Sequence, residues 1–457
     1  MITFATLSKY IGFKNIKDSD RTKLTRKSII ISLLLRPFSV LIGYLMVSVT
    51  LGYLDSERYG IWLTISSIIG WVYLFDVGIG NGLRNNLTKA LARHDYELAR
   101  EYISTSYALM SIISFLILII FFIIYNLLDW SVILNTPKSM EEELKILVFW
   151  VVVINVLRFI IMLINMIFNS IQKPFYNDIL NFVVGALSLI VIFLLTKFFT
   201  SSLLLFGISL SVISVIILAI VTIRFFSRNG KNIRPSIKYI RFDNVGEIVS
   251  LGFKFFILQI GVIIIFATDN IIIAQLYGPE EVTKYNIAFK YFNSVSMLSG
   301  VFLTPLWSAF TNAFESKDYD WIKGAIKKST KFFYAACLLV IIMIFIADYF
   351  YLVWVGKEII IPLNLTIFMG FFVLISLWDN IFVYFLNGVG KIKLQLYITI
   401  FITILNIPLA VFFAKYLNLG IGGVILSSVV CLIPSAILFP IQYSKIMQNK
   451  ARGIFDK

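Results

Sequence analysis

The sequence predicts an all-α integral membrane protein with twelve transmembrane helices arranged as two lobes of six. Three observations support this: the composition, the series of apolar runs, and the placement of the basic residues. Of 457 residues, 59% are hydrophobic and 14% are charged, and the mean hydropathy is +0.90. A soluble chain has about half apolar and about a quarter charged residues, so lipid must surround most of this chain.

The apolar runs are long enough to cross a membrane. A helix needs about 20 residues to span the hydrocarbon core. Twelve such runs are expected, near 27–50, 59–80, 102–126, 144–169, 175–198, 203–226, 246–275, 283–311, 330–354, 362–387, 392–415 and 419–443.

The two ends of the chain are polar. Residues 1–26 are basic and lack the pattern of a removable signal peptide. They either lie on the membrane surface or form a disordered cytoplasmic tail. Residues 444–457 form a second cytoplasmic tail. Cys337 and Cys431 fall within spans, and with His94 they cannot build a disulfide framework or a metal cluster.

Lysine and arginine predict the orientation. The loops on the side of the N-terminus carry 29 of these residues, and those on the other side carry seven. This asymmetry places both termini in the cytoplasm. The net charge of +15 is thus explained by topology and anionic lipid headgroups, and not by nucleic acid.

The two halves of the chain carry a repeat. LTKALARHDYELAREYISTS (87–106) aligns with FTNAFESKDYDWIKGAIKKS (310–329) at an offset of 223 residues. We therefore expect an N-lobe at 27–226, a basic cytoplasmic linker at 227–245 and a C-lobe at 246–443. Because six helices is an even number, the repeat is parallel, with its axis along the membrane normal.

Four cations lie within the expected spans: Arg36, Arg158, Lys254 and Lys290. A central cation costs roughly 2.5–3.5 kcal/mol on insertion scales, which indicates a function or a partner. Arg158 shares one expected helical face with Asn155, Asn165 and Asn169, and the next span carries Asn177 and Asn181. We expect Arg36 and Arg158 to line a polar cavity. Lys254 and Lys290 either do the same or extend to the headgroups.

Two intramembrane carboxylates are candidates for ion coupling, Asp379 near the middle of its span and Asp269 near an end. Asp379 either pairs with a cavity lysine, relays a proton or makes a hydrogen bond between helices. The other intramembrane carboxylates, Asp76, Asp178 and Asp348, lie near span ends. The expected cavity is therefore cationic, and its expected cargo is anionic.

DVGIGNGLR (76–84) has glycines at the spacing of a phosphate-binding loop. Such a loop requires a preceding β-strand, and here a spanning helix precedes it. Gly78, Gly80, Gly82 and Arg84 are therefore interpreted as a cytoplasmic corner that ends the second span. The amphipathic segment 81–100 that follows suits the headgroup layer.

Two stretches resemble the oligosaccharide-lipid flippases of the Wzx or O-antigen type. They are YGIWLTISSIIGWVYLFDVGIGNGLRNNLTKALARHDYELAREYISTSYALM (59–110) and TDNIIIAQLYGPEEVTKYNIAFKYF (268–292). The superfamily includes multidrug and toxin extrusion transporters and lipid II flippases. The resemblance implies a V-shaped pair of lobes around a central cavity. It also implies a flippase that moves an undecaprenyl-pyrophosphate-linked oligosaccharide across the bacterial inner membrane for O-antigen or capsule assembly.

The resemblance further implies alternating access coupled to H⁺ or Na⁺, without a cofactor, and partnership with membrane lipids, a polysaccharide polymerase and a chain-length regulator. A multidrug exporter of the same fold is the nearest alternative, although such proteins resemble one another in using N-lobe carboxylates. A polytopic glycosyltransferase or polymerase would need a larger outer region than residues 127–143.

Overall fold

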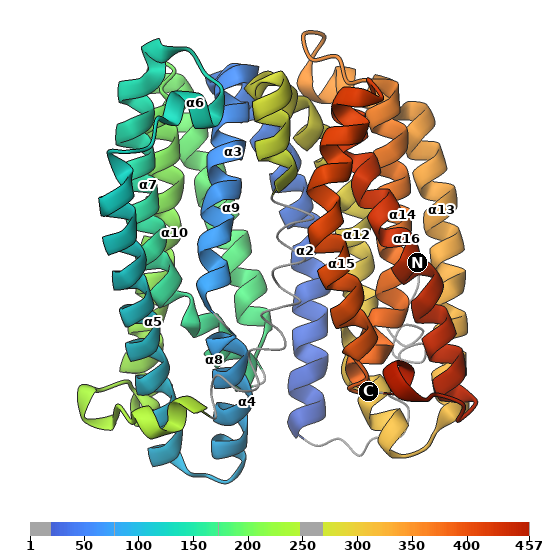
Figure 1. Cartoon of the computed structure of the whole chain (residues 1–457). Helices are drawn as coiled ribbons and strands as arrows, with labels where there is room; N and C mark the ends of the chain where they lie inside the picture. Colours follow the sequence, from blue (N-terminus) through green and yellow to red (C-terminus); the bar gives the residue numbers. More distant parts are fainter. Residues whose placement is uncertain (1–19, 77, 172, 247–267, 457) are drawn as a thin grey trace.

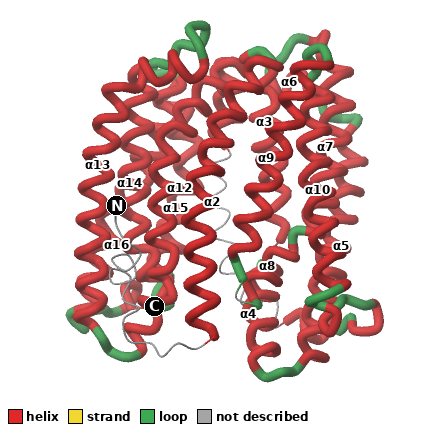
Figure 2. The backbone as a smooth tube through the Cα atoms, turned by 180° about the vertical axis from the view of Figure 1, so that it is seen from behind, coloured by secondary structure: helices red, strands yellow, loops and turns green. Residues whose placement is uncertain are grey.

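The computed structural model describes residues 20–76, 78–171, 173–246 and 268–456. These residues are helical with short loops, and Figure 2 shows no strand among them. The first half contains α2 (Asp20–Tyr53), α3 (Ser56–Val72), the 3₁₀ turn η1 (Tyr73–Asp76), α4 (Ile79–Ala92), α5 (Tyr96–Tyr125), α6 (Trp130–Leu134), α7 (Glu141–Ile161), α8 (Leu163–Ser170), α9 (Phe175–Phe198) and α10 (Leu203–Ser227).

A connector with three 3₁₀ turns, η3 (Lys231–Ile233), η4 (Ile237–Tyr239) and η5 (Phe242–Asn244), leads toward the second half. That half contains a helical segment at 268–277. It continues with α12 (Pro279–Glu315), α13 (Tyr319–Val355), α14 (Leu363–Gly388), α15 (Lys393–Val411), a π-helical turn (Phe412–Tyr416), α16 (Ile421–Met447) and η7 (Gly453–Asp456).

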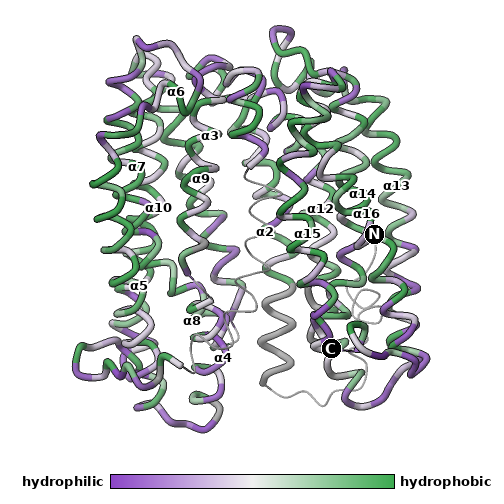
Figure 3. The backbone as a smooth tube through the Cα atoms, viewed as in Figure 1, coloured by the Kyte–Doolittle hydropathy of each residue, from purple (hydrophilic) through white to green (hydrophobic). Residues whose placement is uncertain are grey.

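Within the described residues, nine helices are long and apolar enough to cross a membrane. They correspond to nine of the twelve expected spans, and the expected span 246–275 lies largely outside the described part. The two other expected spans, α3 and α12, pack against each other between the halves, so each shares much of its surface with protein. Figure 3 shows hydrophobic residues along the middle of the bundle and hydrophilic ones at both ends. The chain is a multi-pass membrane protein.

The repeat is visible in the local geometry of two turns. His94 and Lys317 both have positive φ, at 59° and 57°. Asp95 and Asp318 follow them, and each side chain accepts a hydrogen bond from the backbone N–H three residues later, as an N-cap does. Each pair is separated by the offset of 223 residues, so the two turns have the same local geometry at the spacing of the sequence repeat.

The halves differ at their second helices. The second half has one continuous helix, α12, whereas the first half is broken between α3 and α4 at η1. Gly78 lies in this break with φ at 78°, in the left-handed region that glycine tolerates. The expected single span 59–80 therefore ends as a helix at Val72.

The segment after the break is more buried than its sequence indicated. We expected the leucines of 81–100 to lie in the headgroup layer, but Leu83 and Leu87 are fully buried. They belong to a cluster that also contains Leu163 and Ile167 of α8. Packing against a neighbouring helix takes precedence over the amphipathic pattern here.

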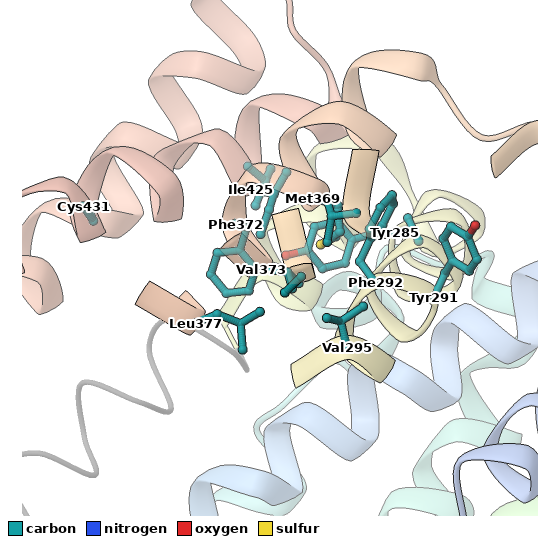
Figure 4. Packing of buried hydrophobic residues seen from close by; sticks show 14 of the residues in the cluster. Tyr285, Tyr291, Phe292, Val295, Met369, Phe372, Val373, Leu377, Ile425 and Cys431 are labelled. Atoms are coloured by element: carbon teal, nitrogen blue, oxygen red, sulfur yellow. The ribbon is translucent and has the colours of Figure 1, made fainter. Parts of the chain in front are cut away.

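Three clusters of buried side chains hold the bundle together. Two lie in the first half, one toward each end, and the largest fills the second half. In the latter, Phe292 of α12, Met369 of α14 and Ile425 of α16 pack near one another (Figure 4). Val47 and Tyr59 of the first half join this cluster, which ties α2 and α3 to the second half.

We call the end of the bundle that holds α6 the α6 end, and the opposite one the α4 end (Figure 1). Among the described residues, the hydrogen bonds between the halves lie toward the α6 end. Thr283 Oγ1 donates to Ser56 O at 2.6 Å, and Trp354 Nε1 donates to Tyr44 O at 2.9 Å. Gly60 permits the closest approach, since a Cβ there would lie 1.7 Å from Pro279 O. The halves are thus joined at the α6 end.

Candidate functional site

Arg158 lies in a polar network within the first half. Its Nη1 donates to the hydroxyl of Tyr73 at 2.9 Å, and that hydroxyl donates to Asn155 Oδ1 at 3.4 Å. Asn155 Nδ2 in turn donates to Ser211 Oγ at 3.3 Å. Within the described residues no carboxylate lies within ion-pair distance of Arg158, and its buried Nε has no hydrogen-bond partner. Arg158 therefore retains donors for a ligand.

Two helix breaks place these groups. Tyr73 is the first residue of η1, where α3 ends. Arg158 lies one turn before Met162, where α7 ends and α8 begins. The side chains of both residues meet where the two helices are interrupted. The predicted single stripe from Asn155 to Asn169 is therefore wrong in part, because the helix that was expected to carry it is not continuous.

Beyond the break, the remaining asparagines form a separate group. Asn177 Nδ2 donates to Asn169 Oδ1 at 3.0 Å and to Asn165 O at 3.3 Å. These bonds connect α8 to the start of α9. Asn181, one turn further along α9, has an exposed side chain. Within the described residues, no side-chain hydrogen bond joins this group to Arg158.

Arg36 of α2 is ion-paired, which the sequence reasoning missed. Its Nε lies 3.9 Å from Asp178 Oδ1 of α9, and Ser32 Oγ also donates to Asp178. Both charged side chains are partly exposed, at 29% and 24%. On the other side, a Cβ at Gly300 of α12 would lie 3.6 Å from Arg36 Nη1. Arg36 is thus placed between the halves, but with its charge balanced.

Lys290 of α12 bridges the halves directly. Its Nζ donates to the hydroxyl of Tyr59 of α3 at 3.0 Å and lies 5.8 Å from the centre of that ring. Of the two readings for Lys290, the contact with Tyr59 favours a position between the halves. Lys254, the fourth predicted cation, lies outside the described residues.

The two candidate carboxylates are buried within the second half. Asp269 is 1% exposed and accepts a hydrogen bond from Tyr285 at 2.5 Å. Asp379 of α14 is 6% exposed and accepts from Ser435 of α16. Asp379 therefore makes the helix-to-helix hydrogen bond that was one of its expected roles, and not a pair with a lysine. Each carboxylate keeps one buried oxygen without a partner in the described part of the chain.

The glycine-rich corner is a helix junction. The carboxylate of Asp76 accepts from Gly80 N at 2.9 Å, and a Cβ at Gly80 would meet that carboxylate at 3.2 Å. Gly82 is buried, and Arg84 is exposed with its carbonyl accepting from Ser170 Oγ at 3.2 Å. An acidic side chain thus occupies the position where a phosphate would need to bind.

Sequence reasoning also missed the tyrosines. Tyr73 and Tyr59 supply the hydroxyls that contact Arg158 and Lys290. Tyr73 sits among apolar residues in the sequence, and Tyr59 directly follows the charged residues Glu57 and Arg58. For Arg36, the sequence did hold a signal. An arginine within the membrane requires a partner, and Asp178 is a carboxylate near the start of another expected span. In the described ranges, no group of three or more His, Cys, Asp or Glu side chains could hold a metal ion.

Comparison with known families decides the relationship. The model of the family described as "Polysaccharide biosynthesis protein" matches residues 25–310, which is more than half of the chain. The chain belongs to this polysaccharide biosynthesis family. The model of the MatE family matches residues 255–412.

Curated and solved relatives agree with this family. The chain is 25% identical over 372 residues to a Yersinia pseudotuberculosis protein named "Putative O-antigen export protein", covering 78% of this chain and 82% of that one. An inward-facing multidrug resistance MATE transporter of the MOP superfamily superposes with a TM-score of 0.72, at 14% identity, covering 92% and 98% of the two chains.

An outward-facing MATE transporter superposes with a TM-score of 0.67, at 15% identity, covering 95% and 99% of the chains. A MOP superfamily transporter from Pyrococcus furiosus, described as having a binding pocket of reversed polarity, gives 0.66 at 14% identity, covering 96% and 100%. These solved structures establish the predicted fold class, an all-α membrane protein with the fold of the MATE transporters.

Proposed function

We propose that the protein is a transporter and not an enzyme: a flippase that moves an undecaprenyl-pyrophosphate-linked oligosaccharide repeat unit across the bacterial inner membrane. The family membership supports a role in the assembly of surface polysaccharide such as O-antigen or capsule. The relative named as an O-antigen export protein supports the direction, out of the cell.

The observation that carries the proposal is the state of Arg158. It is a cation in the last turn of the apolar helix α7, held by the hydroxyl of Tyr73, with no carboxylate in the described residues within ion-pair distance. A guanidinium presents paired donors that match phosphate oxygens. In this proposal Arg158 binds the pyrophosphate of the carrier lipid, while Asn155 and Tyr73 hold the guanidinium in place.

Other residues are assigned supporting roles. Lys290 and Arg36 lie between the halves, where the proposal places the path of the cargo. Asn165 and Asn181 are assigned to the same path. Lys254 is a further candidate for the same path. Asp269 and Asp379, with their unpartnered buried oxygens, are candidates for coupling to H⁺ or Na⁺. We further propose that the two lobes comprise residues 27–226 and 246–443. The proposed protein partners are a polysaccharide polymerase and a chain-length regulator.

The proposal also assigns an orientation. Basic residues gather at the α4 end, including Arg84, Arg228 and Lys317, which favours a cytoplasmic location for that end and for both termini. The halves are joined at the opposite, α6 end. Cargo would therefore reach the site from the cytoplasm in this conformation, and alternating access would open the α6 end.

Gene deletion in the native host tests the function. We expect surface glycan to disappear and lipid-linked repeat units to accumulate inside the cell, and the wild-type gene to restore both. Normal surface glycan in the deletion strain, with no accumulation, would contradict the proposal.

The second candidate is a multidrug exporter, favoured by the solved structures that share the fold. The same deletion strain distinguishes the two. A drug exporter would change the minimum inhibitory concentrations of cationic drugs and leave surface glycan intact, whereas the flippase would affect the glycan first.

A further inference from the structure

A cavity of about 600 Å³ opens at the α4 end of the first half, and its lining contains none of the residues assigned to transport above. It lies among the α8–α9 turn, the last turns of α10 and the first residues of the connector. Its walls include Phe168, Tyr176, Phe225 and Ile233. No function proposed above uses this cavity.

Three cations line the cavity: Lys173, Arg224 and Arg228. The lining includes no acidic residue, but it includes the amides of Asn229 and Asn232. Within the described part of the chain, none of the three cationic side chains forms an ion pair or a hydrogen bond. Arg224 and Arg228 lie one turn apart at the end of α10, and Lys173 comes from the α8–α9 turn. The fold therefore gathers like charges around one cavity whose lining holds no counter-charge. Such an arrangement is stabilised when an anion binds.

The surroundings indicate that the anion is carried by a lipid. Ile216, Ile220 and Ile223 form an exposed stripe on α10, with exposed fractions of 49%, 55% and 67%. Arg224 follows one turn after Ile220 on the same helical face, where the apolar run of α10 ends. An acyl chain lying along this stripe would therefore bring its headgroup to the mouth of the cavity.

The connector forms one wall of the cavity and is held in position by contacts with α5. Arg100 Nε donates to Arg234 O at 2.7 Å, and its guanidinium lies 4.1 Å from the centre of the Tyr239 ring. Ser104 Oγ accepts from Ser236 N at 3.0 Å. These bonds hold the connector on α5, so Arg228 and Asn232 are kept beside α10.

We propose that this cavity binds the phosphate headgroup of an anionic phospholipid from the leaflet at the α4 end. Arg224 and Arg228 would bind the phosphate oxygens with their planar guanidinium groups, and Lys173 would contribute charge from the α9 side. The bound phosphate would join α10, the connector and the α8–α9 turn. Basic pockets between helices on the cytoplasmic side are suited to phosphorylated headgroups.

The test measures binding to the purified full-length protein in detergent by isothermal titration calorimetry, so it is independent of transport. Dioctanoyl phosphatidylglycerol is expected to bind at one saturable site. Each surface cation contributes a factor of about five to the affinity for an anionic lipid. The double variant Arg224→Ala/Arg228→Ala should therefore raise Kd about 25-fold, and Arg224→Lys/Arg228→Lys should retain most of the binding.

The matched control is Lys238→Ala/Lys327→Ala, which removes two exposed cations that do not line the cavity. It should bind as the wild type does. An unchanged Kd in Arg224→Ala/Arg228→Ala, with the protein monodisperse, would overturn the proposal. Inorganic phosphate is titrated in parallel; if it binds as tightly as the lipid, the lipid source is wrong. Equal binding of dioctanoyl phosphatidylcholine would overturn the selectivity for anionic lipid.

Discussion

Nη1 of Arg158 donates a 2.9 Å hydrogen bond to the hydroxyl of Tyr73, which is the first residue after α3. The break in the second helix of the first half thus orients Arg158 of α7. The second half has no such break, since α12 is continuous. This asymmetry places the proposed phosphate-binding arginine in one lobe.

The Tyr73 hydroxyl is expected to matter for transport. Tyr73→Phe removes one hydrogen bond to a charged group, worth about 1.5 kcal/mol or more, and should lower the rate of export by about tenfold at unchanged protein level. Tyr107→Phe is the matched control, because the buried Tyr107 hydroxyl has no hydrogen-bond partner in the described structure. Export is measured as surface glycan in the complemented deletion strain. Equal losses in both variants would show that the effect is not specific to Arg158.

The ion pair of Arg36 and Asp178 allows its structural and transport roles to be separated. Arg36→Gln or Asp178→Asn alone leaves one partly buried charge without its partner and should lower the melting temperature in detergent. The double variant Arg36→Gln/Asp178→Asn should recover most of that loss. If Arg36 also binds cargo, the double variant will be stable but defective in export. A stable and fully active double variant would limit Arg36 to a structural role.

Gly60 is expected to control the joining of the halves at the α6 end. Gly60→Ala places a Cβ 1.7 Å from Pro279 O, so the helices must separate there. Spin labels at Leu127→Cys and Ile360→Cys, both exposed positions at the α6 end, should report longer distances by pulsed electron resonance, with Cys337 and Cys431 replaced.

The matched control for this experiment is Gly70→Ala. Gly70 lies on the same helix, and a Cβ there has no atom within 4 Å. It should leave the label distances unchanged. The same distances in Gly60→Ala and in the wild type would contradict the assignment of this contact as the closed end.

The repeated turns predict repeated energetics. Asp95→Ala and Asp318→Ala each remove an N-cap, which should destabilise the respective helix by about 1 kcal/mol. Asp95→Asn and Asp318→Asn should be tolerated, because asparagine caps nearly as well. Thermal unfolding followed by circular dichroism measures both pairs. A large loss at one turn and none at the other would indicate that the two lobes differ in how they depend on these caps.

Much of the fold could be predicted from the sequence, because long apolar runs and basic loops follow simple physical rules. The sequence repeat at an offset of 223 residues predicts where the two capped turns lie. Each half keeps the residues that form the hydrogen bonds of this short turn, although the sequences of the helices differ. By contrast, α2 begins at Asp20, several residues before the expected span, because the apolar run does not define where a helix starts.

The site was less predictable. The break at Met162 lies in RFIIMLINM (158–166), which contains neither glycine nor proline, so nothing in the sequence marked it. Asp178 is 142 positions from Arg36 in the sequence, and helical periodicity relates only neighbours on one helix. From the sequence, Lys173, Arg224 and Arg228 are explained only by the membrane topology of the chain. Their approach to one cavity depends on the folded connector, which the sequence pattern does not predict.

The most direct test of the central claim is reconstituted transport. Proteoliposomes loaded with an undecaprenyl-pyrophosphate-linked oligosaccharide are compared for the wild type, Arg158→Lys and Arg158→Ala at equal protein content, with a glycan-cleaving enzyme reporting the exposed leaflet. We predict that Arg158→Ala abolishes transfer between leaflets and that Arg158→Lys retains part of it. Transfer by Arg158→Ala at the wild-type rate would contradict the role of Arg158 in binding the pyrophosphate.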